Sequence, residues 1–285
     1  MKSVKMKTNL ALALLLGTVF YMESCSKEAG SGVNNNPVST TTRSKISIHL
    51  TDDPSVVFDK VLLDIQKVEL KFEDNGIDSL SGWHSVAIVP GVYDILQFRN
   101  GIDTIVAVGT IPAGVTLQKV RLTLGNNNSI VVAGVSKPLV VKDNDNQVEA
   151  KLDASNVELI GNDQIHFWID FDAGHSIQVK SSNSGQNTSF ELRSNIRIFS
   201  KAKSGEIEGR VLPAAAQALV VVTNGTDSAS AKPEREGEFK VVGLKAGTYE
   251  VKFHATAGNY RDTVITGVVV RTNEDTKLPT ITLKN

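Results

Sequence analysis

The sequence predicts an all-β protein with two β-sandwich domains that follow a signal peptide and a flexible linker. Valine, isoleucine, threonine and serine are abundant, while aromatic residues make up only 6% of the chain. Such a composition favours strands over helices. Short segments of alternating polarity, separated by turn signals, extend through residues 44–285, as is typical of sandwiches and barrels.

Composition excludes several functions. The formal net charge of −1 over 285 residues provides no basic field that could hold nucleic acid. A single cysteine excludes an intramolecular disulfide. The length is sufficient for one large domain or two modest domains with substantial cores.

The first 24 residues have the layout of a lipoprotein signal peptide. Three lysines precede an apolar run over residues 10–21, which is too short to span a bilayer as a helix. The expected cut lies between Ser24 and Cys25, so that the Cys25 thiol receives the lipid. A cleaved signal without lipid and a short anchor helix are the alternatives.

The residues around the cut depart from the usual lipobox, because Glu23 is acidic. Such loose boxes resemble those of Bacteroidetes-type lipoproteins, and the segment Ser26-Lys27-Glu28 resembles their surface-export tag. Residues 25–43, rich in glycine, serine, asparagine and threonine, form the expected lipidated tether. We therefore expect an extracytoplasmic protein, lipid-anchored at the outer membrane or cell surface.

Residues 44–200 form the expected first domain. Its first strand alternates from Ile46 to Leu50, and residues 83–88 are expected to form one strand. Residues 92–108 fit a short helix or a loop across a sheet end. The central strand, residues 165–171, places Phe167, Ile169 and Phe171 on one face and His166, Trp168 and Asp170 on the other.

Residues 205–285 form the expected second domain, whose length suits a seven-stranded sandwich. Phe239 follows Gly237 at a spacing of two, and Gly243-Leu244 leads to Gly247 and Tyr249. We expect Gly247 to take a positive φ in a tight turn and Tyr249 to pack inward.

The first domain resembles the lipoprotein family of domain of unknown function 4382. The resemblance covers residues 44–200 and is carried by Thr51-Asp52-Asp53-Pro54, Trp83, Tyr93-Asp94-Ile95-Leu96, Ile111-Pro112-Ala113-Gly114, Val120-Arg121-Leu122 and Asp170-Phe171-Asp172-Ala173. It implies a β-domain of the cell envelope and no established activity.

The second domain resembles the carboxypeptidase-regulatory-like, transthyretin-like β-sandwich module over residues 205–283. The motifs around Phe239 and Tyr249 carry this resemblance. It implies an immunoglobulin/transthyretin-like sandwich that spaces, stiffens or binds, without catalytic residues of its own.

Two carboxylates are candidate metal ligands. Asp170 and Asp172 lie two residues apart on one strand face, where they could share a hard cation such as calcium. The alternative is a strand-end aspartate that hydrogen-bonds the backbone of the following turn. Asp143 and Asp145 begin like a calcium loop but lack its glycine and closing glutamate, which favours a hairpin turn. No cofactor other than calcium is indicated.

Histidines and aromatic residues are the other candidates for a site. The five histidines lack ligand spacing, although His166 and His175 could approach each other through a hairpin, with Asp172 nearby. Trp83, Trp168 and Tyr93 could form a sugar-stacking platform if they are exposed, and the candidate ligand-binding residues are Trp83, Trp168 and His175. Core packing is the alternative for each ring.

The sequence therefore predicts a non-enzymatic, lipid-anchored envelope or surface protein that binds a glycan or a protein, as in adhesion. One alternative is an envelope hydrolase or metal-binding protein with its site near Asp170, Asp172 and His175. The other is a structural component of the envelope. The expected partners are the membrane, through the lipid, and a glycan or surface protein, but not nucleic acid.

Overall fold

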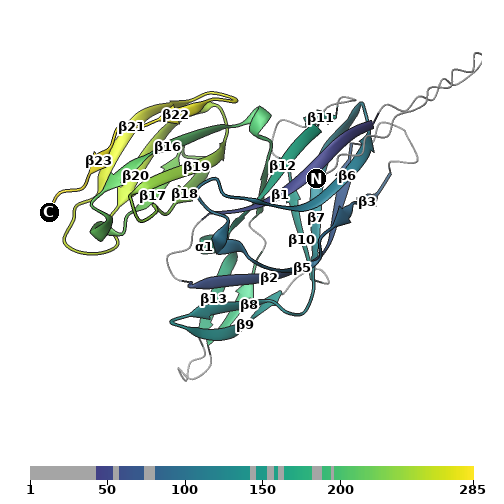
Figure 1. Cartoon of the computed structure of the whole chain (residues 1–285), viewed down its shortest axis with the longest axis horizontal. Coiled ribbons are helices and arrows are strands. Elements are labelled where there is room, and N and C mark those ends of the chain that lie inside the picture. Colours follow the sequence, from purple (N-terminus) through teal and green to yellow (C-terminus); the bar gives the residue numbers. More distant parts are fainter. Residues whose placement is uncertain are drawn as a thin grey trace, which may run out of the picture. The chain divides into compact units, whose positions relative to one another are not determined.

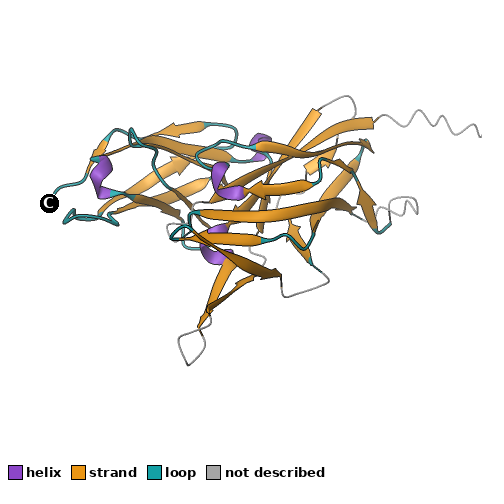
Figure 2. Cartoon of the chain, turned by 60° about the horizontal axis from the view of Figure 1, so that its bottom comes forward, coloured by secondary structure: helices purple, strands orange, loops and turns teal. Residues whose placement is uncertain are grey.

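The computed structural model describes residues 43–53, 58–73, 81–141, 146–152, 157–159, 164–181, 188–193 and 196–285. Residues 41–285 form one compact unit (Figure 1). Strands make up nearly all of the regular structure, and the helices drawn in Figure 2 are single short turns. The predicted all-β fold is confirmed, with four sheets in the described residues. The predicted signal peptide, the tether and Cys25 lie outside these residues.

The first sandwich, residues 43–199, is built from two sheets. The five-stranded sheet has the order β15-β12-β1-β6-β4, with β1 (Arg43–Asp53), β4 (Ala87–Ile88), β6 (Thr104–Pro112), β12 (Gln164–Asp172) and β15 (Ile196–Phe199). The ten-stranded sheet has the main order β10-β7-β2-β8-β9-β14-β13, while β11 pairs with β7 and both β3 and β5 pair with β2. Its strands are β2 (Lys60–Phe72), β3 (Trp83–Ser85), β5 (Gly91–Asp94), β7 (Val115–Leu124), β8 (Ser129–Val132), β9 (Val135–Val141), β10 (Gln147–Lys151), β11 (Val157–Leu159), β13 (Ile177–Ser181) and β14 (Thr188–Leu192).

The second sandwich, residues 205–283, has two four-stranded sheets. One has the order β19-β16-β22, with β23 also paired to β16, and the other has the order β18-β17-β20-β21. The strands are β16 (Gly205–Leu212), β17 (Leu219–Thr223), β18 (Ser228–Ala231), β19 (Glu238–Leu244), β20 (Gly247–His254), β21 (Thr263–Val270), β22 (Asp275–Lys277) and β23 (Ile281–Thr282). The short helices among the described residues are η2 (Ile95–Gln97), α1 (Ala173–Ser176), η3 (Lys201–Lys203) and η4 (Ala214–Ala216).

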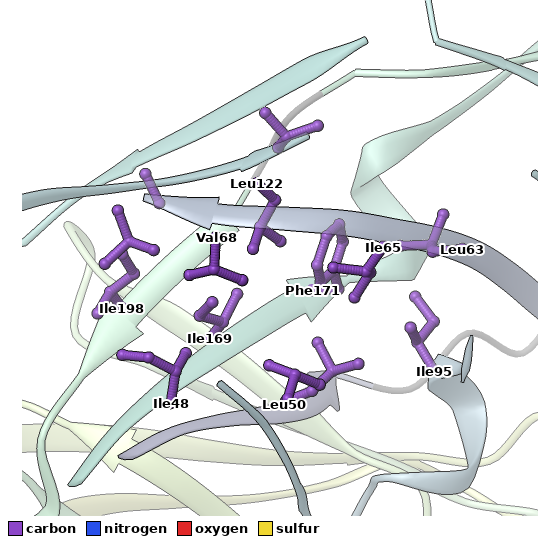
Figure 3. Close-up of a cluster of buried hydrophobic side chains, with 14 of the residues drawn as sticks. Ile48, Leu50, Leu63, Ile65, Val68, Ile95, Leu122, Ile169, Phe171 and Ile198 are labelled. Atoms are coloured by element: carbon purple, nitrogen blue, oxygen red, sulfur yellow. The ribbon is translucent and has the colours of Figure 1, made fainter. Parts of the chain in front are cut away.

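Strand β1 lies between β12, with which it runs parallel, and β6, with which it runs antiparallel. Its alternating sequence points Ile48 and Leu50 into the core, beside Ile169 and Phe171 of β12 (Figure 3). Side chains of β2 and β7 from the other sheet complete this core: Leu63, Ile65, Val68 and Leu122. Burial of each such side chain contributes about 1.5–3 kcal/mol, so the two-residue period fixes which face of each sheet points inward.

The segment 83–88 forms two strands rather than the single predicted strand. β3 pairs with β2 in the ten-stranded sheet, whereas β4 pairs with β6 in the five-stranded sheet. Between them, the Val86 side chain packs against the core. A strand that changes sheets closes one corner of a sandwich, which an alternating sequence cannot reveal.

The sequence predicted a short helix or a loop for residues 92–108, whereas the structure also has strand residues there. This region contains the end of β5, the 3₁₀ turn η2 and the start of β6. Ile95 and Leu96 of the turn are buried, so the predicted packing of apolar residues at this point is present as a single 3₁₀ turn.

The core of the second sandwich surrounds Tyr249, which is buried as predicted and donates a hydrogen bond from its hydroxyl to the Lys245 carbonyl at 3.0 Å. The prediction for Gly247 is wrong, because the residue with a positive φ in this motif is Gly243, at 73°. Gly243 lies within β19, just before Leu244, at the point where the pairing with β16 shifts register, and its left-handed backbone suits such a bulge.

A small apolar cluster of Trp168, Phe199 and Val242 joins the two sandwiches. Gly243 lies directly against it, since an added Cβ would overlap the ring of Phe199. The absence of a side chain at Gly243 therefore permits this contact as well as the left-handed backbone.

We expect Gly243→Ala to destabilise the chain more than Gly225→Ala. Both glycines have positive φ, but a Cβ at Gly225 would meet nothing within 4 Å. The left-handed backbone should cost each variant about 1–2 kcal/mol, and overpacking against Phe199 should cost Gly243→Ala about a further 1–3 kcal/mol. Urea unfolding of both variants measures the difference, and equal losses would contradict the Phe199 contact.

Candidate functional site

The outward face of β1 and β12 is polar but largely buried. Ser47, His49 and Thr51 are 3%, 8% and 2% exposed, and Asp170 is 2% exposed. Buried polar groups are stable only when they are hydrogen-bonded. Thr51 meets this requirement by donating its hydroxyl hydrogen to the Phe98 carbonyl at 2.8 Å.

His49 lies at the centre of a hydrogen-bonded chain. Its Nδ1 is 2.7 Å from Asp103 Oδ1, and its Nε2 is 2.9 Å from Nδ1 of His166. The other oxygen of Asp103 accepts the indole N–H of Trp168 at 2.7 Å. Asp103 therefore joins two strands of the sheet through the segment that precedes β6.

Only one proton can lie between the two imidazole rings. If His49 is neutral and donates to Asp103, its Nε2 accepts from His166; if His49 is charged, it donates to both neighbours. When both rings are charged, each facing nitrogen carries a hydrogen, and the bond between the rings is lost. The arrangement therefore resists full protonation.

The electrostatic surroundings of His166 also oppose protonation of its ring. Burial and the neighbouring His49 lower the pKa of His166 below its ordinary value, and Lys201 also lowers it. Asp103 raises this pKa without reversing the shift. His49 from β1, Asp103 from the segment before β6 and Lys201 from η3 are the titratable groups that act on this ring.

Trp168 is enclosed in a stack. The rings of His49 and Phe199 lie nearly parallel to it, at centroid distances of 4.6 and 6.0 Å, and Lys201 Nζ lies 4.7 Å from its centroid. The residue is only 8% exposed. Trp168 therefore forms part of the contact between the sandwiches, and in this conformation its ring faces are not accessible to a sugar.

Trp83, the other predicted ligand-binding tryptophan, is covered by a cation. The guanidinium of Arg121 lies 4.1 Å from its ring centroid and also bonds the buried carboxylate of Glu69, at 2.8 Å. Burial raises the pKa of Glu69, but hydrogen bonds from Lys67 and Arg121 outweigh that effect and leave it below its ordinary value. This group is a fixed, charged patch on the outer face of the ten-stranded sheet.

The carboxylate of Asp170 is paired with an arginine. Its Oδ2 accepts hydrogen bonds from Arg197 of the adjacent strand β15, and this guanidinium already neutralises the carboxylate. Asp172 lies two residues further on β12, while the side chain of His175 lies outside the described part, as do Asp143 and Asp145. Within the described residues, no group of three or more histidine, cysteine or acidic side chains could hold a metal ion. Calcium binding by Asp170 and Asp172 stays a prediction.

The sequence suggested that His166 approaches His175, whereas the structure pairs His166 with His49. This pairing depends on the parallel register of β1 and β12, which sets Ser47 opposite His166 and His49 opposite Trp168. The two histidines lie 117 positions apart in the sequence, so local patterns cannot reveal the contact.

A cleft of roughly 480 Å³ opens on the outer face of the sheet β19-β16-β22, a volume within the range of ligand sites. Asn100 of the first sandwich contributes to its lining. The rest of the lining belongs to the second sandwich and consists mainly of charged side chains: Glu208, Arg210, Glu234, Glu238, Lys240 and Lys277. Asn100 also donates from Nδ2 to the Lys232 carbonyl at 2.8 Å. Alternating charged and apolar residues in β16 and β19 were the available sequence signal for this surface.

The family described as a domain of unknown function, DUF4382, matches residues 43–194, which is more than half of the chain. The chain belongs to this family. Membership of the DUF4382 family, predicted for residues 44–200, is thereby confirmed over residues 43–194, and the match ends before the second sandwich. A search of curated proteins finds no match.

Solved structures similar to this DUF4382 protein are distant. A cohesin–X-dockerin complex from Acetivibrio cellulolyticus has a chain 27% identical over 28% of this protein and 56% of its own length, with a TM-score of 0.23. A shaft pilin from Lactobacillus rhamnosus GG is 9% identical over 86% of this chain and 98% of its own, with a TM-score of 0.22. A fimbrial protein from Bacteroides ovatus is 8% identical over 85% and 50%, with a TM-score of 0.24. This chain therefore spans about half the length of the cohesin-complex chain, and these likenesses are too distant to identify its ligand.

Among the described residues, no helix has the length and apolar character needed to cross a bilayer.

We expect the free energy of unfolding to fall as the pH is lowered from 7.5 to 5. The lowered pKa of His166 means that the unfolded chain binds its proton first, near the ordinary value of 6.5, so stability present above that pH is lost as the pH falls through the folded value. Urea unfolding across this range measures the slope, and His166→Asn should reduce it by up to one proton.

The control is Thr266→Asn, which changes an exposed residue of the second sandwich that does not titrate. This variant should retain the acid loss seen in the unmodified chain. Identical slopes for the His166→Asn variant and the unmodified chain would show that the ring pair does not resist protonation.

Proposed function

We propose that this DUF4382 protein is a non-enzymatic, lipid-anchored protein of the cell envelope or surface that serves as a binding or adhesion module. The observation that carries the proposal is the open, charged cleft on β16 and β19. A rigid sheet face with exposed polar groups suits recognition of a partner.

The side chains of types that could act in catalysis are already engaged in contacts within the fold, which supports a binding role. Asp170 is neutralised by Arg197, and His49 is held between Asp103 and His166. Trp168 is enclosed between two rings. These groups hold strands and sandwiches together, whereas catalysis requires an acid, base or nucleophile that can reach a substrate.

The second sandwich is proposed to be a carboxypeptidase-regulatory-like, transthyretin-like module. The buried Phe239 and Tyr249 of its two signature motifs support this assignment. The module would then present the cleft, and the DUF4382 domain would connect it to the tether.

The anchor is proposed to be a lipid on Cys25. The basic, apolar and small residues that precede this cysteine support it. Two or more acyl chains on one residue anchor a protein stably without a membrane-spanning helix.

We expect Cys25→Ala to release the chain from the membrane fraction. The substituted residue has no thiol that could accept a lipid, while the folded sandwiches should be unaffected. Fractionation, with mass spectrometry of the N-terminal peptide, tests this expectation. Unchanged membrane association, together with an unmodified Cys25 in the natural chain, would contradict the anchor.

We expect Lys277→Trp to abolish ligand capture by the full chain. Lys277 is 78% exposed at the cleft, so an indole there should obstruct the opening, and loss of an exposed ion pair should cost at most about 1 kcal/mol. Glycan arrays and pull-downs from envelope extracts, with bound proteins identified by mass spectrometry, provide the readout.

The matched control is Lys252→Trp, which places the same side chain at an exposed position on β20, in the other sheet. It should leave capture unchanged. Capture that is equally insensitive to both substitutions, or an absence of any ligand in both assays, would contradict the proposed binding site.

A further inference from the structure

The cleft on β16 and β19 contains charged groups that the fold leaves without partners. Arg210 donates from Nε to the Glu236 carbonyl at 2.7 Å, while its two Nη atoms have no partner among the described residues. The carboxylates of Glu234 and Glu238, both exposed, likewise lack a hydrogen-bond or ion-pair partner there. One oriented cation and two anions therefore face the solvent of the cleft.

The bond to Glu236 prepares Arg210 to recognise an acid. It restrains the plane of the guanidinium, and the two remaining N–H groups can receive a carboxylate in the bidentate geometry that this side chain favours. Glu238 is the cross-strand neighbour of Arg210 in the β16–β19 register, but no ion pair joins them in this conformation.

In the adjacent part of the cleft, around Glu208, Lys240 and Lys277, opposite charges already pair with one another. Glu208 lies 3.0 Å from Lys277 Nζ and 3.6 Å from Lys240 Nζ. Burial lowers the pKa of Lys240, but Glu206, Asp275 and Glu208 outweigh that effect and raise it above its ordinary value. These charges therefore have partners even without a ligand. The groups left for recognition are Arg210, Glu234 and Glu238.

The cleft does not suit a sugar platform. Phe239, the aromatic ring that lines it, is 3% exposed. Trp83 and Trp168 are covered by Arg121 and by two rings, respectively. Charge complementarity is therefore the main chemistry available, and it favours a polypeptide with both acidic and basic side chains over a neutral glycan.

We propose that the cleft binds a polypeptide segment of mixed charge, with an acidic side chain on Arg210 and a basic side chain on Glu234 and Glu238. This inference rests on the proposed binding function and specifies its ligand. An extended segment places alternate side chains on one face at a spacing similar to that of the strands below it. Three charges of the cleft can thus be matched by neighbouring residues of one peptide.

The test is calorimetric titration of the full chain with an end-blocked charged hexapeptide in which lysine, glutamate and lysine alternate with serine, so that all three charged side chains share one face of the extended peptide. A serine–glycine hexapeptide and cellohexaose serve as the uncharged peptide and the neutral glycan. Binding is expected for the charged hexapeptide alone, with an affinity that falls at high salt.

Arg210→Gln should weaken binding of the charged hexapeptide about tenfold, the effect of losing one charge-assisted contact. Glu238→Gln should weaken it by a similar factor. Arg261→Gln, which removes an exposed arginine from another loop of the same sandwich, should leave it unchanged. Circular dichroism of each variant checks that the fold is retained.

Equal affinity in Arg210→Gln, Glu238→Gln and the unmodified chain would overturn the inference, as would binding of cellohexaose in place of the charged hexapeptide. If envelope ligands are captured in a Lys277-dependent manner but the charged hexapeptide does not bind, the inference fails while the proposed function stands. Loss of both would reject the two together.

Discussion

The rest of the structure depends on the burial of β1 on both faces. Its inward side chains, Ile46, Ile48 and Leu50, belong to the main core, and its outward ones are covered as well. A strand with alternating polarity can be enclosed in this way only if every outward polar group finds a partner. The segment 98–103 supplies such partners, since the Phe98 carbonyl binds Thr51 and Asp103 binds His49. The same segment carries Asn100, which lines the cleft of the second sandwich.

This requirement explains why residues that resemble catalytic groups serve as structural ones. An aspartate, two histidines and a tryptophan form one hydrogen-bonded chain because the second layer above β1 removes them from water. Trp168 then reaches Phe199 and Val242, so the polar chain continues into the apolar contact between the sandwiches. The charged side chains on the outer face of β16 and β19, in the second sandwich, are not part of this enclosed layer. The enclosed polar chain and the charged cleft thus lie on different sheets.

Local patterns in the sequence were sufficient for the fold class and for the inward faces. Alternation identified Ile48, Phe167 and Phe171 as core residues, and the second glycine motif identified Tyr249. Pairing between distant segments was not accessible in this way, because hydrogen bonds between strands depend on backbone groups that every residue possesses. The His49–His166 contact, the change of sheet at Val86 and the cross-strand position of Arg210 and Glu238 all follow from such pairing. The cleft was missed for the same reason, since its charges come from three strands and a loop.

The parallel pairing of β1 with β12 has a consequence for the order of folding. His49 and His166 are separated by 117 residues, so β1 leaves the ribosome long before its parallel neighbour exists. Contacts of such sequence separation slow folding, because the intervening chain must be ordered before they can form. Until then the edge of β1 that pairs with β12 lacks its hydrogen-bonding partner, and an unpaired strand edge favours aggregation. The first strand among the described residues is therefore among the last to be paired along both edges.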